Sequence, residues 1–123
     1  MVKAIRVHQA GEPEIMIWKE VVAPDPGLSE VRIVNTAIGV NFVDSYMRRG
    51  LGPFGDGEGC FPMDYPAVLG FEGADVVDAV GGGVDEISPG DRVTYTGLLM
   101  GAYAQSRVMP ADQLVLLPDD IDE

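Results

Sequence analysis

The sequence predicts a mainly β fold, either a barrel or a sandwich. Short runs of β-branched and aliphatic residues recur along its 123 residues, and turns rich in glycine and proline separate them. The apolar fraction of 46% is typical of a globular protein. By length we expect one domain, residues 1–123, that buries enough surface to fold without disulfides.

The first half of the chain contains three predicted strands. Residues 2–7 are the first, and residues 11–14 read as a turn because they combine Gly, Glu and Pro. Residues 15–22 are a second β-prone run. Two prolines and a glycine in 23–27 then interrupt the ladder, because proline donates no backbone hydrogen bond. A third strand begins at Val31.

The second half opens with a long glycine-rich segment, residues 51–65. Loops of this length are usually functional or mobile, and a surface loop without a role is an equal alternative. Residues 67–80 are β-rich but interrupted by Gly70 and Gly73, which indicates a bulge or a close backbone approach. The segment 119–123, which is acidic except for Ile121, suits the start of a helix. Three further short strands are predicted at 92–96, 103–109 and 113–117.

The strongly acidic composition argues against two kinds of partner. The net charge of −12 disfavours binding to nucleic-acid phosphates or to an anionic membrane surface, and it favours solubility.

Cys60 is the only cysteine, so neither an internal disulfide nor a cysteine-based zinc cluster can form, and we read Cys60 as incidental. The N-terminus carries no apolar signal segment, and we expect a cytoplasmic protein.

Residues 37–50 are the most informative segment of the sequence. An apolar strand end, 37–40, precedes Asn41, which can cap a helix. Asp44 follows near the positive end of the helix dipole, and Gly50 suits a left-handed helix end. The segment is therefore expected to bring the polar groups of Asn41, Asp44 and Tyr46 onto one short turn facing a cleft. Two pairs share a helix face, Phe42 with Tyr46 and Val43 with Met47.

This segment, AIGVNFVDSYMRRG, resembles the signature of the quinone oxidoreductases, the zeta-crystallin group of the medium-chain dehydrogenase/reductase superfamily. Other motifs follow in that family's order: LSEVRI at 28–33, LGFEGA at 69–74, VGGGV at 80–84, PGDRV at 89–93 and GAY at 101–103. The resemblance implies a GroES-like, partly open β-barrel with one or two short helices. It also implies that the nucleotide-binding Rossmann domain is absent from these residues.

The resemblance further implies an enzyme without metal. Alcohol dehydrogenases of the superfamily have zinc-binding Cys and His at the positions of Asn41 and Phe71, and neither of these residues is a useful zinc ligand. His8 is expected to be an ordinary residue of the first strand. Glu72 is expected to be a buried or hydrogen-bonded structural carboxylate.

By the same resemblance, the complete enzyme transfers hydride from NADPH to a quinone or conjugated enone. Such an acceptor is already electrophilic and needs only oriented hydrogen-bond donors at its carbonyl. The implied catalytic residues are Asn41 and Tyr46, although a helix cap and a core aromatic are the alternatives from the residues alone. The implied cofactor-lining residues are Asn41, Phe42, Val43, Asp44, Ser45 and Tyr46.

Two other functions stay open. One is an enoyl reductase of the same superfamily, and the other is a stand-alone GroES-like binding or assembly module without catalysis. Gly81 to Gly83 are not read as a phosphate loop, because turn residues rather than a helix follow them. We expect most NADPH contacts to come from the missing domain, so that this segment alone is inactive, and the complete enzyme to be a homodimer.

Overall fold

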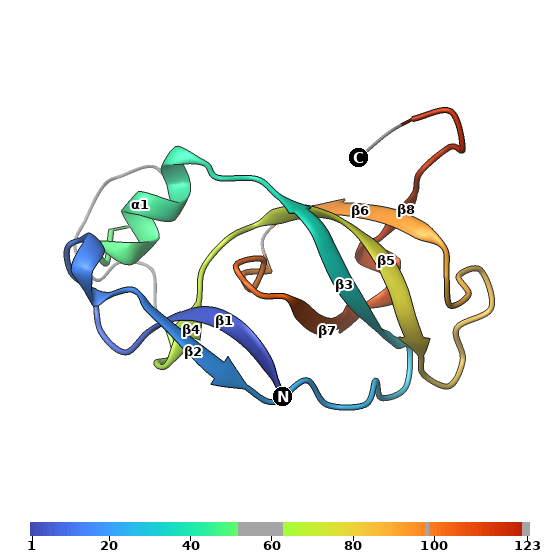
Figure 1. Ribbon diagram of the computed structural model, residues 1–123, viewed down its shortest axis with the longest axis horizontal. Helices are drawn as coiled ribbons and strands as arrows, with labels where there is room; N and C mark the ends of the chain where they lie inside the picture. The colour runs from blue at the N-terminus through green and yellow to red at the C-terminus, as the bar shows by residue number, and fades with distance from the viewer. Residues whose placement is uncertain (52–62, 98, 122–123) are drawn as a thin grey trace.

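The computed structural model describes residues 1–51, 63–97 and 99–121. Within them the chain forms two open antiparallel sheets and a short α-helix, and the molecule is elongated (Figure 1). The smaller sheet and the helix occupy one end, and the larger sheet occupies the other. None of the helices in these residues is long and apolar enough to cross a bilayer.

The smaller sheet has the strand order β2-β1-β4. Strand β1 (Val2–Val7) pairs with β2 (Ile17–Val21), and its other edge pairs with β4 (Ala67–Val68). A 3-10 turn, η1 (Pro13–Ile15), connects β1 to β2 and begins with proline, which suits the first helical position.

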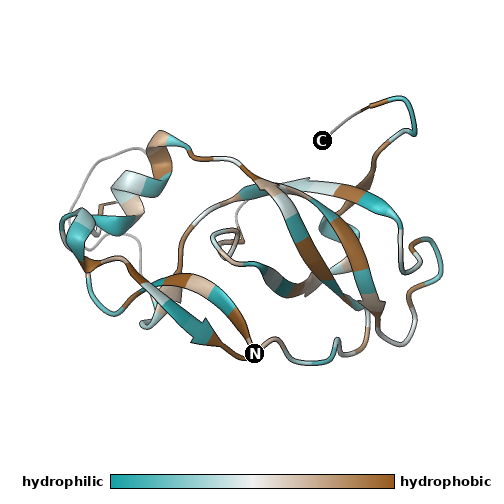
Figure 2. Cartoon of the chain, viewed as in Figure 1, coloured by the Kyte–Doolittle hydropathy of each residue, from teal (hydrophilic) through white to brown (hydrophobic). Residues whose placement is uncertain are grey.

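The larger sheet has the order β7-β3-β5-β6-β8. Its long central pair is β3 (Glu30–Ile38) and β5 (Glu72–Val80), and hydrophobic residues colour much of both strands in Figure 2. Buried residues alternate along β5, as expected for a strand with one face against the core. The remaining elements are β6 (Arg92–Thr96), β7 (Ser106–Pro110), η2 (Ala111–Gln113) and β8 (Val115–Leu116).

The segment before β7 joins the two sheets. Ala104 forms an isolated bridge with Ala4 of β1, the Ile5 N–H donates to the Tyr103 carbonyl at 2.8 Å, and the Gln105 N–H donates to the Lys3 carbonyl at 2.8 Å. Each sheet has its own apolar cluster. Val31, Ile33, Val77 and Val93 are among the members of the larger one, and Val7, Met47 and Leu69 form the smaller one.

The mainly β fold predicted from the sequence is confirmed, with sheets that stay open and do not close into a barrel. One α-helix, α1 (Phe42–Arg48), and the two 3-10 turns are the helical elements of the described residues. The predicted strand at 103–109 begins only at Ser106, because the backbone of Tyr103 bonds to Leu69 and Ile5 instead of a ladder neighbour.

Other boundaries also differ from the prediction. His8 lies just beyond β1 and is exposed, so it is not a residue of the first strand. Residues 15–16 belong to η1 and its end, which shortens β2. Asp119 and Asp120 lie in a turn closed by a hydrogen bond from the Ile121 N–H to the Pro118 carbonyl, and the predicted helix start is not seen up to residue 121. The predictions for Cys60 and for most of the 51–65 loop lie outside the described residues.

Candidate functional site

Strand β3 leads into α1 through an extended residue, Asn41, as the sequence predicts. Asn41 has φ −125° and ψ 158°, and it forms a capping box with Asp44. Gly50 has φ +80° and ends the helix: its N–H donates to the Met47 carbonyl at 3.1 Å, and the Leu51 N–H donates to the Tyr46 carbonyl at 2.8 Å. This pair of bonds is a Schellman motif. Because a seven-residue helix is unstable alone, both caps and the packing of its inner face define it.

The three polar groups predicted to share this turn do not point the same way. Asn41 is exposed and Tyr46 is half-buried, whereas Asp44 is 4% exposed. The rings of Phe42 and Tyr46 lie 6.4 Å apart, so this predicted pair forms on the outer face. Met47 packs inward with Val43 against it. The turn therefore leaves Asn41 exposed and Tyr46 partly exposed, and it directs Asp44 into the protein.

Asp44 binds a residue that the sequence did not mark as functional. Its Oδ2 accepts the Asn41 N–H at 3.0 Å and the Tyr103 hydroxyl at 2.5 Å. Burial raises the pKa of the Tyr103 phenol, and the hydrogen bond to Asp44 and the Asp44 charge raise it further. Tyr103 belongs to the GAY motif at 101–103, but the sequence contains no signal that pairs it with a helix 59 residues earlier.

The remaining predicted cofactor-lining residues have defined contacts. The Ser45 hydroxyl donates to the Phe42 carbonyl at 2.7 Å, which occupies the hydroxyl proton within the helix. Phe42 is 83% exposed, and Val40, just before the turn, is 79% exposed. Two exposed apolar side chains therefore flank the exposed Asn41.

The residues at the zinc positions of alcohol dehydrogenases do not fit a metal. Asn41 is engaged in the capping box, and the Phe71 ring packs against the cluster around Met47 and Leu69. Glu72 is half-buried, and its carboxylate covers Gly39 so closely that no Cβ would fit there. The described residues contain no group of three His, Cys, Asp or Glu side chains placed to hold an ion.

Two hollows flank the segment that leads into the turn. One, of about 470 Å³, includes Gly39, Glu72 and Thr94 in its lining. The other, of about 300 Å³, includes Trp18, Ile38 and Val40 and is largely apolar. Its amide groups are already hydrogen-bonded: Asn35 donates to the Ala104 carbonyl at 2.9 Å, for example.

Gly82 and Gly83 lie in a turn, and the triple glycine does not resemble a phosphate loop. The Gly81 N–H donates to the Glu30 carbonyl at 2.8 Å, the Ser29 N–H donates to the Gly82 carbonyl at 2.8 Å, and Gly83 has φ +81°. No helix follows in residues 84–91. The N–H groups that would cradle a phosphate at a helix start are therefore missing from this segment.

Two open antiparallel sheets joined beside a short capped helix define a GroES-like domain. The chain belongs to the alcohol dehydrogenase GroES-like domain family, whose model matches residues 27–119.

Curated relatives match nearly the whole chain. It is 44% identical over 123 residues to a 2-haloacrylate reductase of a Burkholderia species, and 40% identical over 121 residues to a quinone oxidoreductase of Salmonella typhimurium. These matches cover 99% and 98% of this chain and 35% of each relative. The chain thus spans about a third of the length of the relatives it matches.

Solved structures agree with this assignment. The Escherichia coli quinone oxidoreductase, solved in complex with NADPH, matches with a TM-score of 0.86 at 37% identity. That match covers 98% of this chain and 34% of the other. The family resemblance seen in the sequence is therefore confirmed.

Proposed function

We propose that this chain is the catalytic-domain portion of a zinc-independent NADPH:quinone oxidoreductase that transfers hydride to a quinone or conjugated enone. The observation that carries the proposal is the capped turn that leaves Asn41 exposed and Tyr46 partly exposed, in a chain similar to quinone oxidoreductases over nearly all its length. The other two thirds of the natural protein would supply the nucleotide-binding domain and most NADPH contacts. Residues 1–123 alone would then be inactive.

Asn41 and Tyr46 are the proposed catalytic residues. NADPH, when bound, would supply the hydride. The Asn41 carboxamide and the Tyr46 hydroxyl would each donate a hydrogen bond to the acceptor's carbonyl oxygen, where negative charge develops during reduction. Neither group has to act as a base, and the proton that completes the reduction would come from water. Donors fixed in advance by a capped turn need little reorganisation at the moment of reaction.

The cofactor-lining set is proposed as Asn41, Phe42, Val43, Asp44, Ser45 and Tyr46. The exposed Phe42 side chain and the adjacent backbone would pack against the nicotinamide ring. Asp44 would contribute through the turn that it caps, because its carboxylate is buried. Val43 would contribute through the backbone, since its side chain packs inward.

Zinc independence is proposed because Asn41 and Phe71, at the zinc positions of alcohol dehydrogenases, do not fit a metal. Protein purified without added metal should contain far less than one zinc per chain, and dialysis against a chelator should leave NADPH oxidation unchanged. Stoichiometric zinc whose removal abolishes activity would contradict this part of the proposal.

A second acceptor class is favoured by a specific similarity. The relative named 2-haloacrylate reductase acts, by its name, on an acrylate, in which a carbon–carbon double bond is conjugated to a carboxyl group. An enoyl thioester has the same conjugation, so the enoyl reductase alternative differs only in the acceptor.

The test is NADPH oxidation by the protein as its gene encodes it, with three acceptors in parallel: a simple benzoquinone, a 2-haloacrylate and an enoyl thioester. Preference for the quinone supports the main proposal, and preference for either of the others assigns the second class. A protein that oxidises no NADPH with any of the three acceptors would favour the stand-alone binding module. Sedimentation of the same sample tests the proposed homodimer.

A further inference from the structure

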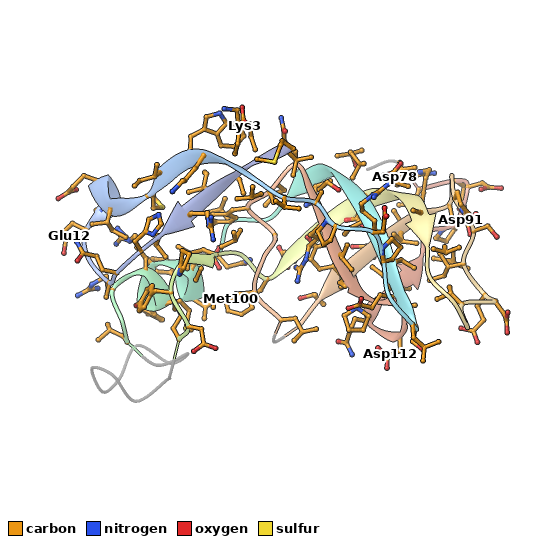
Figure 3. The ribbon with its side chains drawn as sticks, turned by 90° about the horizontal axis from the view of Figure 1, so that it is seen from below. Lys3, Glu12, Asp78, Asp91, Met100 and Asp112 are labelled. Atoms are coloured by element: carbon orange, nitrogen blue, oxygen red, sulfur yellow. The ribbon has the colours of Figure 1, made fainter. Side chains whose placement is uncertain are left out.

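The backbone of Tyr103 forms hydrogen bonds to two other segments of the chain. Its N–H donates to the Leu69 carbonyl at 2.9 Å, and its carbonyl accepts the Ile5 N–H at 2.8 Å. Leu69 follows β4, and Ile5 lies within β1, so both anchors belong to the smaller sheet or its edge. Met100 of the same connection is labelled in Figure 3, where it lies between the two ends of the molecule. The position of the Tyr103 ring is therefore fixed by strands rather than by a free loop.

The Tyr103 ring packs directly against Gly70, which has no side chain. A Cβ at Gly70 would lie 2.5 Å from Tyr103 Cδ1 and 2.9 Å from the Ala102 Cβ, and Gly70 has φ +97°. Any other residue would collide with the ring and would also adopt an unfavourable backbone conformation. The glycine interruption between β4 and β5 thus has a packing reason, and the ring passing over it brings the Tyr103 hydroxyl to Asp44.

The Asp44 carboxylate is more deeply buried than a helix cap requires. It is 4% exposed, and its Oδ2 accepts both the Asn41 N–H and the Tyr103 hydroxyl. Its Oδ1 has no hydrogen-bond partner among the described residues. An unsatisfied buried carboxylate oxygen is costly, and an exposed aspartate would cap the helix without that cost. Helix capping alone therefore does not account for the arrangement.

We propose that Tyr103, acting through Asp44, is a positioning residue that fixes the orientation of the Asn41–Tyr46 turn toward the cofactor and the acceptor carbonyl. The inference rests on the proposed function. Asp44 bonds directly to the Asn41 backbone, so a shift of the carboxylate moves the residue that carries the proposed donor. Tyr103 links that carboxylate to β1 and to the end of β4, and the turn is thereby tied to the smaller sheet.

The test compares two tyrosines in the natural-length protein. Tyr103→Phe removes the hydroxyl that reaches Asp44. Tyr95→Phe is the matched control, because Tyr95 is also a core tyrosine whose hydroxyl donates to a neutral group, Asn35 Oδ1, at 3.1 Å. For Tyr103→Phe we expect kcat to fall about 10-fold while the KM for NADPH changes little, since a small misplacement acts mainly in the transition state. Tyr95→Phe should leave kcat within about twofold of wild type, even if it lowers the free energy of unfolding as much as Tyr103→Phe does.

A double-mutant cycle and amide exchange complete the test. Asp44→Asn and Tyr103→Phe combined should lower kcat no more than the larger single effect, because the two residues act as one unit. Hydrogen exchange of peptides covering residues 37–50 should be faster in Tyr103→Phe than in Tyr95→Phe.

Equal kcat values and equal exchange in the two phenylalanine variants would overturn the positioning role. A wild-type protein that oxidises no NADPH would instead overturn the proposed function, and the exchange result would still decide whether Tyr103 holds the turn.

Discussion

At the scale of single residues, Asn41 combines two roles that can be separated. Its exposed carboxamide is the proposed donor to the acceptor carbonyl, and the residue also caps α1. Serine caps a helix about as well as asparagine but carries no amide donor. Alanine provides neither function. The two substitutions therefore distinguish a catalytic asparagine from a structural one.

We expect Asn41→Ser to keep the free energy of unfolding within about 0.5 kcal/mol of wild type, and Asn41→Ala to lose about 1 kcal/mol. In the natural-length protein both should lose most of the NADPH:quinone activity. Urea unfolding and steady-state kinetics measure the two effects. Full activity in Asn41→Ser would assign Asn41 to the helix cap alone.

The raised pKa of Tyr103 predicts a loss of stability in alkali. Its phenol keeps its proton in the folded protein at pH values where the unfolded chain releases it, so the folded state binds more protons. This contribution is fully present below the unfolded pKa of about 10 and is lost as the pH rises above it. Burial also raises the pKa of Tyr95, which acts in the same direction.

Tyr103→Phe should therefore show a shallower fall in unfolding free energy than wild type between about pH 9 and pH 11. Urea denaturation at several pH values measures this slope. Identical slopes would show that the Tyr103 hydroxyl is not buried against Asp44.

At the scale of elements, the sequence predicted the β3–turn–α1 unit well because its signals are local. The cap at Asn41, the face-sharing pairs and the left-handed Gly50 each depend on residues within a few positions of one another. The direction of Asp44 was not predictable in this way. It is decided by Tyr103, which is far away in the sequence and marked only indirectly by Gly70.

Strand ends were predicted less well for the same reason. The irregular backbone at Tyr103 and Ala104 exists because this segment bonds to the smaller sheet, a tertiary contact without a local pattern. The turn at Asp119 and Asp120 likewise does not follow from the acids that suggested a helix, since acidic residues favour a helix start without requiring one.

Gly70 offers a test of the packing between elements. Gly70→Ala should lower the free energy of unfolding by at least about 3 kcal/mol, because the left-handed conformation and the collision with Tyr103 both oppose a Cβ. Gly90→Ala is the control, since Gly90 has a similar φ of +95° but no atom within 4 Å of the added Cβ. It should lose only the backbone cost of about 1–2 kcal/mol. Chemical denaturation of both variants gives the comparison, and equal losses would contradict the packing account.

At the scale of the whole molecule, the chain carries a net charge of −12. In Figure 3, Glu12 lies at one end of the molecule, and Asp78, Asp91 and Asp112 lie toward the other. Of these, Asp78 pairs with Arg32 at 2.7 Å. Like charges distributed in this way repel one another and oppose the compact state.

Added salt should therefore stabilise the protein. Raising NaCl from about 0.02 M to about 0.5 M should increase the midpoint of thermal unfolding, because the Debye length shortens and the repulsion is screened. A midpoint that falls with NaCl would indicate that favourable ion pairs outweigh the repulsion.

The most direct test of the central claim is the steady-state rate of NADPH oxidation by the natural-length gene product, measured with a benzoquinone for wild type and for Tyr46→Phe. If the Asn41–Tyr46 turn orients the acceptor, wild type consumes NADPH, and Tyr46→Phe loses about 10²-fold in kcat with an unchanged unfolding midpoint. No consumption by wild type, or equal rates in the two proteins, would contradict the account.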